Sequence, residues 1–147
     1  MRRILAALGA AVLALGILPA GAGEPVADAA QGRPAAPRAA VKELATREVA
    51  GASGKEVRML TVEYIPGGAS LAHRHNAQVF VYVLSGSVKM QVAGGPLLTL
   101  GPGETFYEAP DDVHTVSANA SATKPARILV FMIKDAGAPV TLPASGK

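Results

Sequence analysis

The sequence contains no cysteine and no tryptophan, and its aromatic residues are limited to three tyrosines and three phenylalanines. A chain without cysteine can form neither a disulfide framework nor a thiolate metal centre. The few aromatic side chains offer little for base stacking, and Lys and Arg nowhere gather into a cluster. Without Arg2 and Arg3 the chain carries 12 basic against 11 acidic residues, so the pI near 9.5 does not indicate a nucleic-acid partner.

Long hydrophobic runs are also lacking. The apolar stretch 4–19 is shorter than the ~20 residues that a membrane-spanning helix needs, and alanine and glycine dilute it. It follows Arg2-Arg3 and precedes Ala20-Gly21-Ala22, a pattern that signal peptidases cleave. We therefore expect residues 1–22 to be a signal peptide, and the mature protein to be periplasmic or secreted, with no stable membrane insertion.

The remaining length allows one domain. Residues 23–40 are mostly Ala, Pro and Gly, which bury too little apolar surface to become ordered, so we expect a flexible leader. Residues 41–134 carry the folded pattern. Residues 135–147 are again rich in Gly, Pro and Ala, and we expect a loose C-terminal tail.

The folded region reads as a row of short strands separated by turn residues. Residues 56–65 alternate with a period of two and end at Pro66-Gly67-Gly68. Similar apolar or β-branched segments follow at 79–84, 88–92, 97–100, 105–108, 115–117 and 127–133. Turns every 8–12 residues indicate an all-β sandwich or barrel. Residues 40–50 fit a helical turn pattern and a lead-in strand equally well.

The chain has three histidines, His73, His75 and His114. On a strand, residues two apart face the same side, so the first two rings project together, about 7 Å apart along the backbone. His114 follows the next turn-rich segment, in a strand that can return beside the first. A lone His-x-His is more often a surface feature than a metal site, so the surrounding pattern decides.

That pattern resembles the cupin superfamily over about residues 44–134. The first family motif corresponds to Gly67, five residues, His73-Arg74-His75, three residues, Val79, six residues and Gly86. The second corresponds to Gly103, five residues, Ala109-Pro110-Asp111, two residues and His114, with Asn119 one place later than in the family. Val79 replaces the glutamate that is the fourth family ligand. Ala109 and Asp111 replace a Pro and a Gly, and an Asp tolerates the backbone dihedrals of such a turn.

The resemblance implies a small antiparallel jelly-roll β-barrel, often a homodimer, with one divalent transition metal in its mouth. Its ligands would be His73, His75 and His114. Imidazole suits Fe, Zn, Mn, Ni or Cu, whereas Mg and Ca prefer oxygen.

Two polar side chains near the histidines are candidate catalytic groups. In a regular strand Val79 faces inward and Gln78 outward, whereas a bulge at residues 76–77 would turn the Gln78 amide towards the metal. Glu108 lies two residues before Pro110 and can face either way.

Two functions follow from this pattern. The first is a three-histidine oxygenase or lyase that acts on a small oxygen-rich molecule, such as an enolate, a catechol or a 2-oxo acid. The second is a non-catalytic cupin module that binds a metal or a small ligand. The intact histidines favour the first, and Val79 favours the second.

Overall fold

The computed structural model describes residues 38–145, so the expected signal peptide and most of the expected leader lie outside the described residues. Residues 38–145 contain no helix, and hence none that could cross a membrane. Their ten strands are β1 (Ala39–Glu48), β2 (Lys55–Tyr64), β3 (His73–Arg74), β4 (Ala77–Ser85), β5 (Val88–Val92), β6 (Leu98–Leu100), β7 (Thr105–Glu108), β8 (Val113–Asn119), β9 (Ala126–Asp135) and β10 (Leu142–Pro143).

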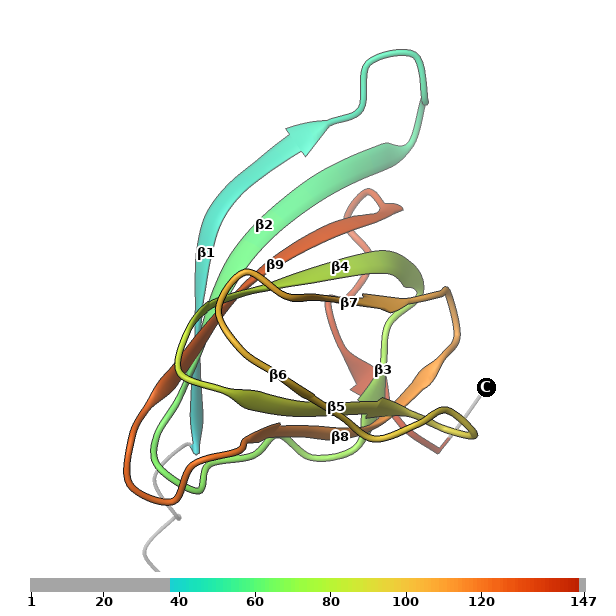
Figure 1. The fold of residues 1–147 in the computed structure, drawn as a ribbon. Helices are drawn as coiled ribbons and strands as arrows, with labels where there is room; N and C mark the ends of the chain where they lie inside the picture. Colours follow the sequence, from blue (N-terminus) through green and yellow to red (C-terminus); the bar gives the residue numbers. More distant parts are fainter. Residues whose placement is uncertain (1–37, 146–147) are drawn as a thin grey trace, which may run out of the picture. The chain divides into compact units, whose positions relative to one another are not determined.

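The strands form two five-stranded antiparallel sheets, in the orders β1-β2-β9-β4-β7 and β10-β3-β8-β5-β6. Figure 1 shows the two sheets as facing layers, with β4 and β9 in one and β5 and β8 in the other. The all-β jelly-roll prediction is confirmed. The closed barrel is not, because the hydrogen-bonded ladders stay within each sheet and the structure is a sandwich.

The core lies between the sheets and follows from alternation along the strands. On β4, Val79, Val81 and Val83 point inward and are buried, whereas Phe80 and Tyr82 on the other face are exposed. Burying each valine contributes roughly 1.5–3 kcal/mol. The sequence of this strand alternates valines with aromatic residues, so the valines lie on its inner face and the aromatic residues on its outer face.

Both ends of the folded region differ from the expectation. β1 starts at Ala39, inside the expected leader, and shows that residues 40–48 are a strand and not a helical turn. Beyond the expected domain end at residue 134, β10 pairs with β3, with Leu142 opposite Arg74 and Pro143 opposite His73. The segment expected to be a loose tail is therefore part of the sheet that carries the histidines.

Asn119, at the end of β8, joins three segments through its side chain. Its amide nitrogen donates to the carbonyl oxygens of Ile65 (3.0 Å) and Lys124 (2.7 Å). Its Oδ1 atom accepts a hydrogen bond from the backbone nitrogen of Ser121 at 2.8 Å. Asn119 is buried. Its role at this position of the second motif is therefore to connect loops through hydrogen bonds, and not to contact a ligand.

We expect Asn119→Ala to lower the free energy of unfolding by about 2–3 kcal/mol, because it leaves several buried backbone groups without a partner. Urea denaturation monitored by circular dichroism measures this change. The exposed Asn76 offers a matched control, and Asn76→Ala should change stability by less than about 0.5 kcal/mol. Equal changes in the free energy of unfolding for the two substitutions would contradict the role of Asn119 in connecting the loops.

A buried ion pair joins β2 and β9. Lys134 is 2% exposed, and its Nζ atom donates a hydrogen bond to Glu56 Oε1 at 2.6 Å. This bond holds the pKa of Glu56 below its usual value of 4.5. Glu56 therefore stabilises the fold above pH ~4.5, and that contribution is lost as pH falls through the lowered pKa.

We expect Glu56→Gln to make stability less dependent on pH between about pH 5 and pH 3, because the glutamine does not take up a proton there. Thermal unfolding followed across this range checks the slope. An unchanged acid slope in Glu56→Gln would show that other carboxyl groups dominate acid sensitivity.

Candidate metal centre

The structure brings the three histidine rings together where β3 lies beside β8. His73 and His114 are directly opposite each other in the strand pairing, and His75 follows the end of β3. The ring centroid of His73 is 4.9 Å from that of His75 and 5.2 Å from that of His114. The second-motif turn is tied to the first motif, because the Asp111 nitrogen donates to the His75 carbonyl oxygen at 3.1 Å. Asp111, which stands where the second motif has a Gly, has a φ of 69°, in the left-handed region that favours glycine.

Two of the rings are oriented by backbone carbonyl groups. His73 Nδ1 donates to the Leu71 oxygen at 2.7 Å, and His75 Nδ1 donates to the Val140 oxygen at 2.5 Å. Since a carbonyl oxygen can only accept, the proton of each neutral ring sits on Nδ1, which leaves Nε2 with a free lone pair. Metal-binding histidines are commonly held in this way. Val140 was not foreseen, because nothing in the sequence around it marks a partner for a histidine.

Burial keeps the first of these rings neutral. It lowers the pKa of His73 below the usual 6.5, and the nearby His75 and His114 lower it further. The Leu71 hydrogen bond acts in the opposite direction but is the smaller influence. A neutral imidazole is the form that binds a metal.

Glu108, at the end of β7, is the carboxylate of the cluster. It is 2% exposed. Its Oε1 atom lies 3.1 Å from His114 Nδ1, and its Oε2 atom lies 3.8 Å from His75 Nε2. Two atoms of this group, Glu108 Oε2 and His114 Nε2, are buried and make no hydrogen bond. The structure thus turns Glu108 inward, one of the two orientations that the sequence allowed.

The other candidate catalytic residue is not brought to the cluster. Gln78 is exposed on the outer face of β4, since the strand is regular from Ala77 and Val79 takes the inward position. The bulge that would have turned the Gln78 amide inward is absent from this part of β4. Gln78 therefore lies outside the candidate site.

The histidines and Glu108 are among the residues that line a cavity of about 390 Å³. Its wall is largely apolar and comes from the inner faces of β2, β4 and β9: Leu60, Val62, Val79, Val81, Ile128, Val130 and Met132. The Tyr64 hydroxyl also lines the cavity, 2.6 Å from Ser117 Oγ. A cavity of this size and polarity suits a small molecule with a few oxygen atoms.

The donor atoms are gathered but do not converge on one point. Within residues 38–145, no group of three or more His, Cys, Asp or Glu side chains is arranged so that it could hold a metal ion. The chemistry of the set still fits a transition ion, because imidazole nitrogens and a carboxylate are its usual ligands. Glu108 Oε2 and His114 Nε2 are buried and have no partner, and a cation is a group that could satisfy either of them.

Comparison with known proteins agrees with the fold. Residues 60–132, from β2 to β9, match the Cupin domain family. None of the curated proteins matches the sequence. A solved oxalate oxidase in complex with glycolate has a TM-score of 0.56 and 25% identity, over 74% of this chain and 56% of that one.

Two further solved structures share the fold. The DMSP lyase DddQ from Ruegeria pomeroyi has a TM-score of 0.55 and 22% identity, over 75% of this chain and 54% of that one. An uncharacterized conserved protein with a double-stranded β-helix domain from Klebsiella pneumoniae has a TM-score of 0.58 and 19% identity, over 77% and 90%. The chain thus spans only about half the length of the oxidase and the lyase.

Proposed function

Because this chain belongs to the cupin superfamily, we propose that it is an exported protein that holds one divalent transition metal through His73, His75 and His114. The observation that supports the proposal most strongly is that the three histidine rings lie close together and line the same cavity. The carbonyl groups of Leu71 and Val140 add support, since they leave two Nε2 atoms free for a metal.

The bound ion would supply Lewis acidity towards oxygen atoms of a small molecule. Around it, the valines of β4 exclude water, which strengthens electrostatic interactions within the cavity. Glu108 lines the same cavity and its Oε2 atom has no hydrogen-bond partner, so this oxygen is available to the ion or to a ligand bound beside it. These features suit an oxygenase or lyase acting on a small oxygen-rich substrate, and the oxidase and lyase of the same fold support that choice.

A non-catalytic module that binds a metal or a small ligand is the second candidate. It is favoured by Val79, which is 1% exposed and places an apolar side chain where the family carries a carboxylate ligand. A weakened ligand set is compatible with capture of a ligand without turnover.

Turnover assays separate the two candidates. The mature protein, loaded in turn with Fe, Mn, Ni, Cu and Zn, is tested for O2 uptake with diketones and catechols, and for lyase products with small carboxylates. Turnover with at least one metal, lost in His75→Ala, supports the enzyme. Binding of metal and ligand without turnover supports the module. Failure to bind any metal would contradict the enzyme and a metal-binding module, and would leave only a module that binds a small ligand without metal.

Export is tested by expressing the full chain in a bacterial host and sequencing the N-terminus of the secreted or periplasmic product. We expect cleavage close to Ala22. Retention of the uncleaved chain in the cytoplasm would contradict export.

A further inference from the structure

β7 brings a carboxylate to the place where the first motif lacks one. In the antiparallel pairing of β4 with β7, Val79 lies directly opposite Glu108. Side chains directly opposite each other project to the same face, with Cβ atoms about 4.5–5.5 Å apart. Both side chains are buried, at 1% and 2% exposure, and both line the histidine cavity. Loss of the carboxylate from β4 is thus matched by a carboxylate on the neighbouring strand.

The surroundings of Glu108 are those of a ligand and not of an ordinary ion pair. One oxygen lies 3.1 Å from His114 Nδ1 and the other 3.8 Å from His75 Nε2, so it stands between the two motifs. A buried ionised carboxylate is unfavourable unless a cation or hydrogen bonds compensate its charge. Oε2 is buried and has no hydrogen bond, so a bound cation would supply the partner that it lacks.

We propose that Glu108 is the anionic donor of the metal centre and replaces, from β7, the glutamate that the family carries at the position of Val79. The inference rests on the proposed three-histidine site and adds a fourth ligand to it. The resulting set of three imidazoles and one carboxylate lowers the net charge of a divalent centre from +2 to +1. It also suits a harder ion such as Mn²⁺, which prefers carboxylate oxygen, better than three imidazoles do.

A glutamine at this position distinguishes a ligand from a positioning residue. The amide of Glu108→Gln has nearly the same reach and can still lie beside His114 Nδ1, so a purely positioning role would survive the change. The negative charge is lost, so a role as anionic donor would not. The substitution has nearly the same shape, which keeps the buried site packed.

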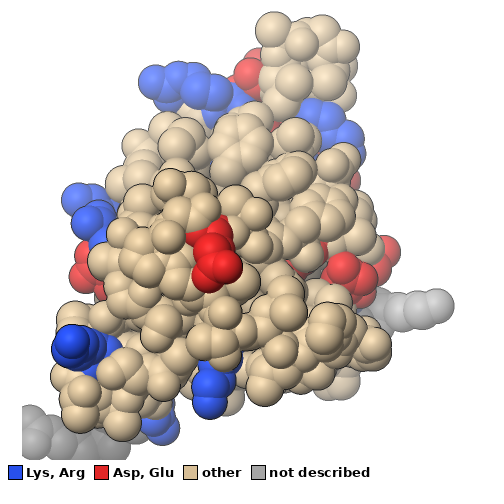
Figure 2. All heavy atoms as spheres, viewed as in Figure 1, with Lys and Arg blue, Asp and Glu red and all other residues tan. Residues whose placement is uncertain are grey.

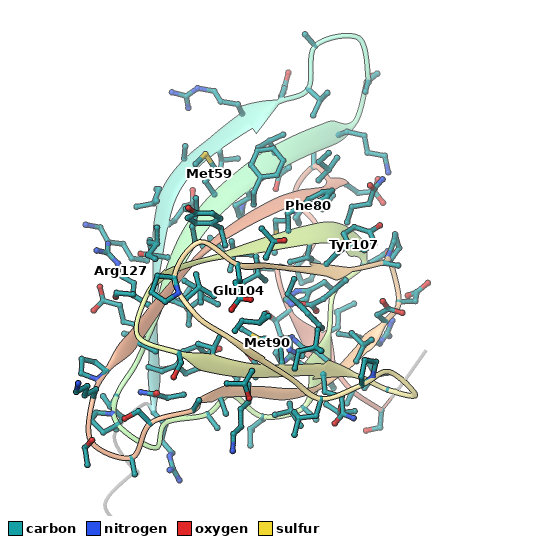
Figure 3. The ribbon with its side chains drawn as sticks, in the orientation of Figure 1. Met59, Phe80, Met90, Glu104, Tyr107 and Arg127 are labelled. Carbon is teal, nitrogen blue, oxygen red and sulfur yellow. The ribbon has the colours of Figure 1, made fainter. Side chains whose placement is uncertain are left out.

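The experiment is a chelator-competition titration of the metal-free full-length mature protein with Co²⁺ and Mn²⁺. We expect Glu108→Gln to weaken binding by at least the ~10–100-fold typical of groups that support a metal site, more strongly for Mn²⁺ than for Co²⁺. The visible absorption of bound Co²⁺ should also shift, because its ligand set changes. Glu104→Gln is the matched control, since Glu104 is exposed just before the same strand (Figure 3).

The second variant moves the carboxylate from β7 to β4 by a double substitution. In Val79→Glu/Glu108→Val the carboxylate returns to β4 on the same face, and we expect much of the affinity to be regained. Affinity within about twofold of wild type in Glu108→Gln, with an unchanged Co²⁺ spectrum, would overturn the inference and leave the three-histidine site standing. Absence of metal binding by the wild-type protein would instead overturn the proposed function itself.

Discussion

His114→Ala is expected to weaken binding of a divalent transition metal by more than about 100-fold, beyond the 10–100-fold effect of losing an outer partner. His114 comes from β8 and is the proposed ligand that joins the second motif to the first, directly opposite His73. Two histidines from one segment would remain, and they cannot enclose an ion from both sides of the cavity. Isothermal titration of the metal-free protein with Ni²⁺ or Zn²⁺ measures the loss.

The control must account for packing, because His114 is buried and its ring stacks on Phe106 with centroids 5.7 Å apart. Phe106→Leu removes that ring contact and keeps all three histidines. We expect it to bind metal with nearly wild-type affinity while losing some stability. If Phe106→Leu and His114→Ala weakened metal binding equally, packing and not coordination would explain the effect.

Gly86→Ala is expected to lower the free energy of unfolding by about 3–5 kcal/mol, from backbone strain and a steric clash together. Gly86 has a φ of +72° in the turn between β4 and β5. A Cβ atom there would lie 2.4 Å from the Pro125 carbonyl oxygen and 2.7 Å from Ala126 Cα. Backbone atoms at that distance must move, and they belong to the start of β9 in the centre of the sheet.

Gly94→Ala is the matched control, since Gly94 has a φ of +77° but an added Cβ would meet nothing within 4 Å. It should cost only about 1–2 kcal/mol, because the backbone strain acts alone. Guanidinium denaturation of both variants gives the comparison. Equal stability of the two would show that the turn around Gly86 adapts, and that the close approach to β9 does not constrain it.

Much of the fold could be predicted from the sequence because its longer strands alternate clearly. The segments at 56–65, 79–84 and 127–133 correspond to β2, β4 and β9, whose inner faces form one side of the core. β10 could not be predicted, since two residues show no periodicity and one of them is Pro143. Its pairing with β3 depends on a contact between distant parts of the chain.

The site could be predicted only in part, for a similar reason. The histidine cluster could be predicted, because His73 and His75 are two residues apart and the motif pattern supplied His114. The direction of Glu108 depends on the pairing of β7 with β4, which no local pattern reveals. The role of Val140 is a backbone contact, and any residue there could supply its carbonyl oxygen.

The outer surface carries charged and aromatic side chains that lie away from the buried histidine cluster. Figure 2 shows Lys and Arg mostly towards the rim of the viewed face, with largely uncharged surface between them. Phe80 and Tyr107 pack against each other on the outside of β4 and β7, with ring centroids 5.1 Å apart (Figure 3). They line a different pocket from the histidines, so their substitution should leave metal affinity unchanged.

The most direct measurement is elemental analysis of the mature protein, purified without a histidine tag and dialysed against metal-free buffer after loading. About one Fe, Mn, Ni, Cu or Zn per chain, reduced to background in the triple variant with alanine at positions 73, 75 and 114, is the expected result. Background metal in the wild-type protein after loading with each of these ions would contradict a shared site for the three imidazoles.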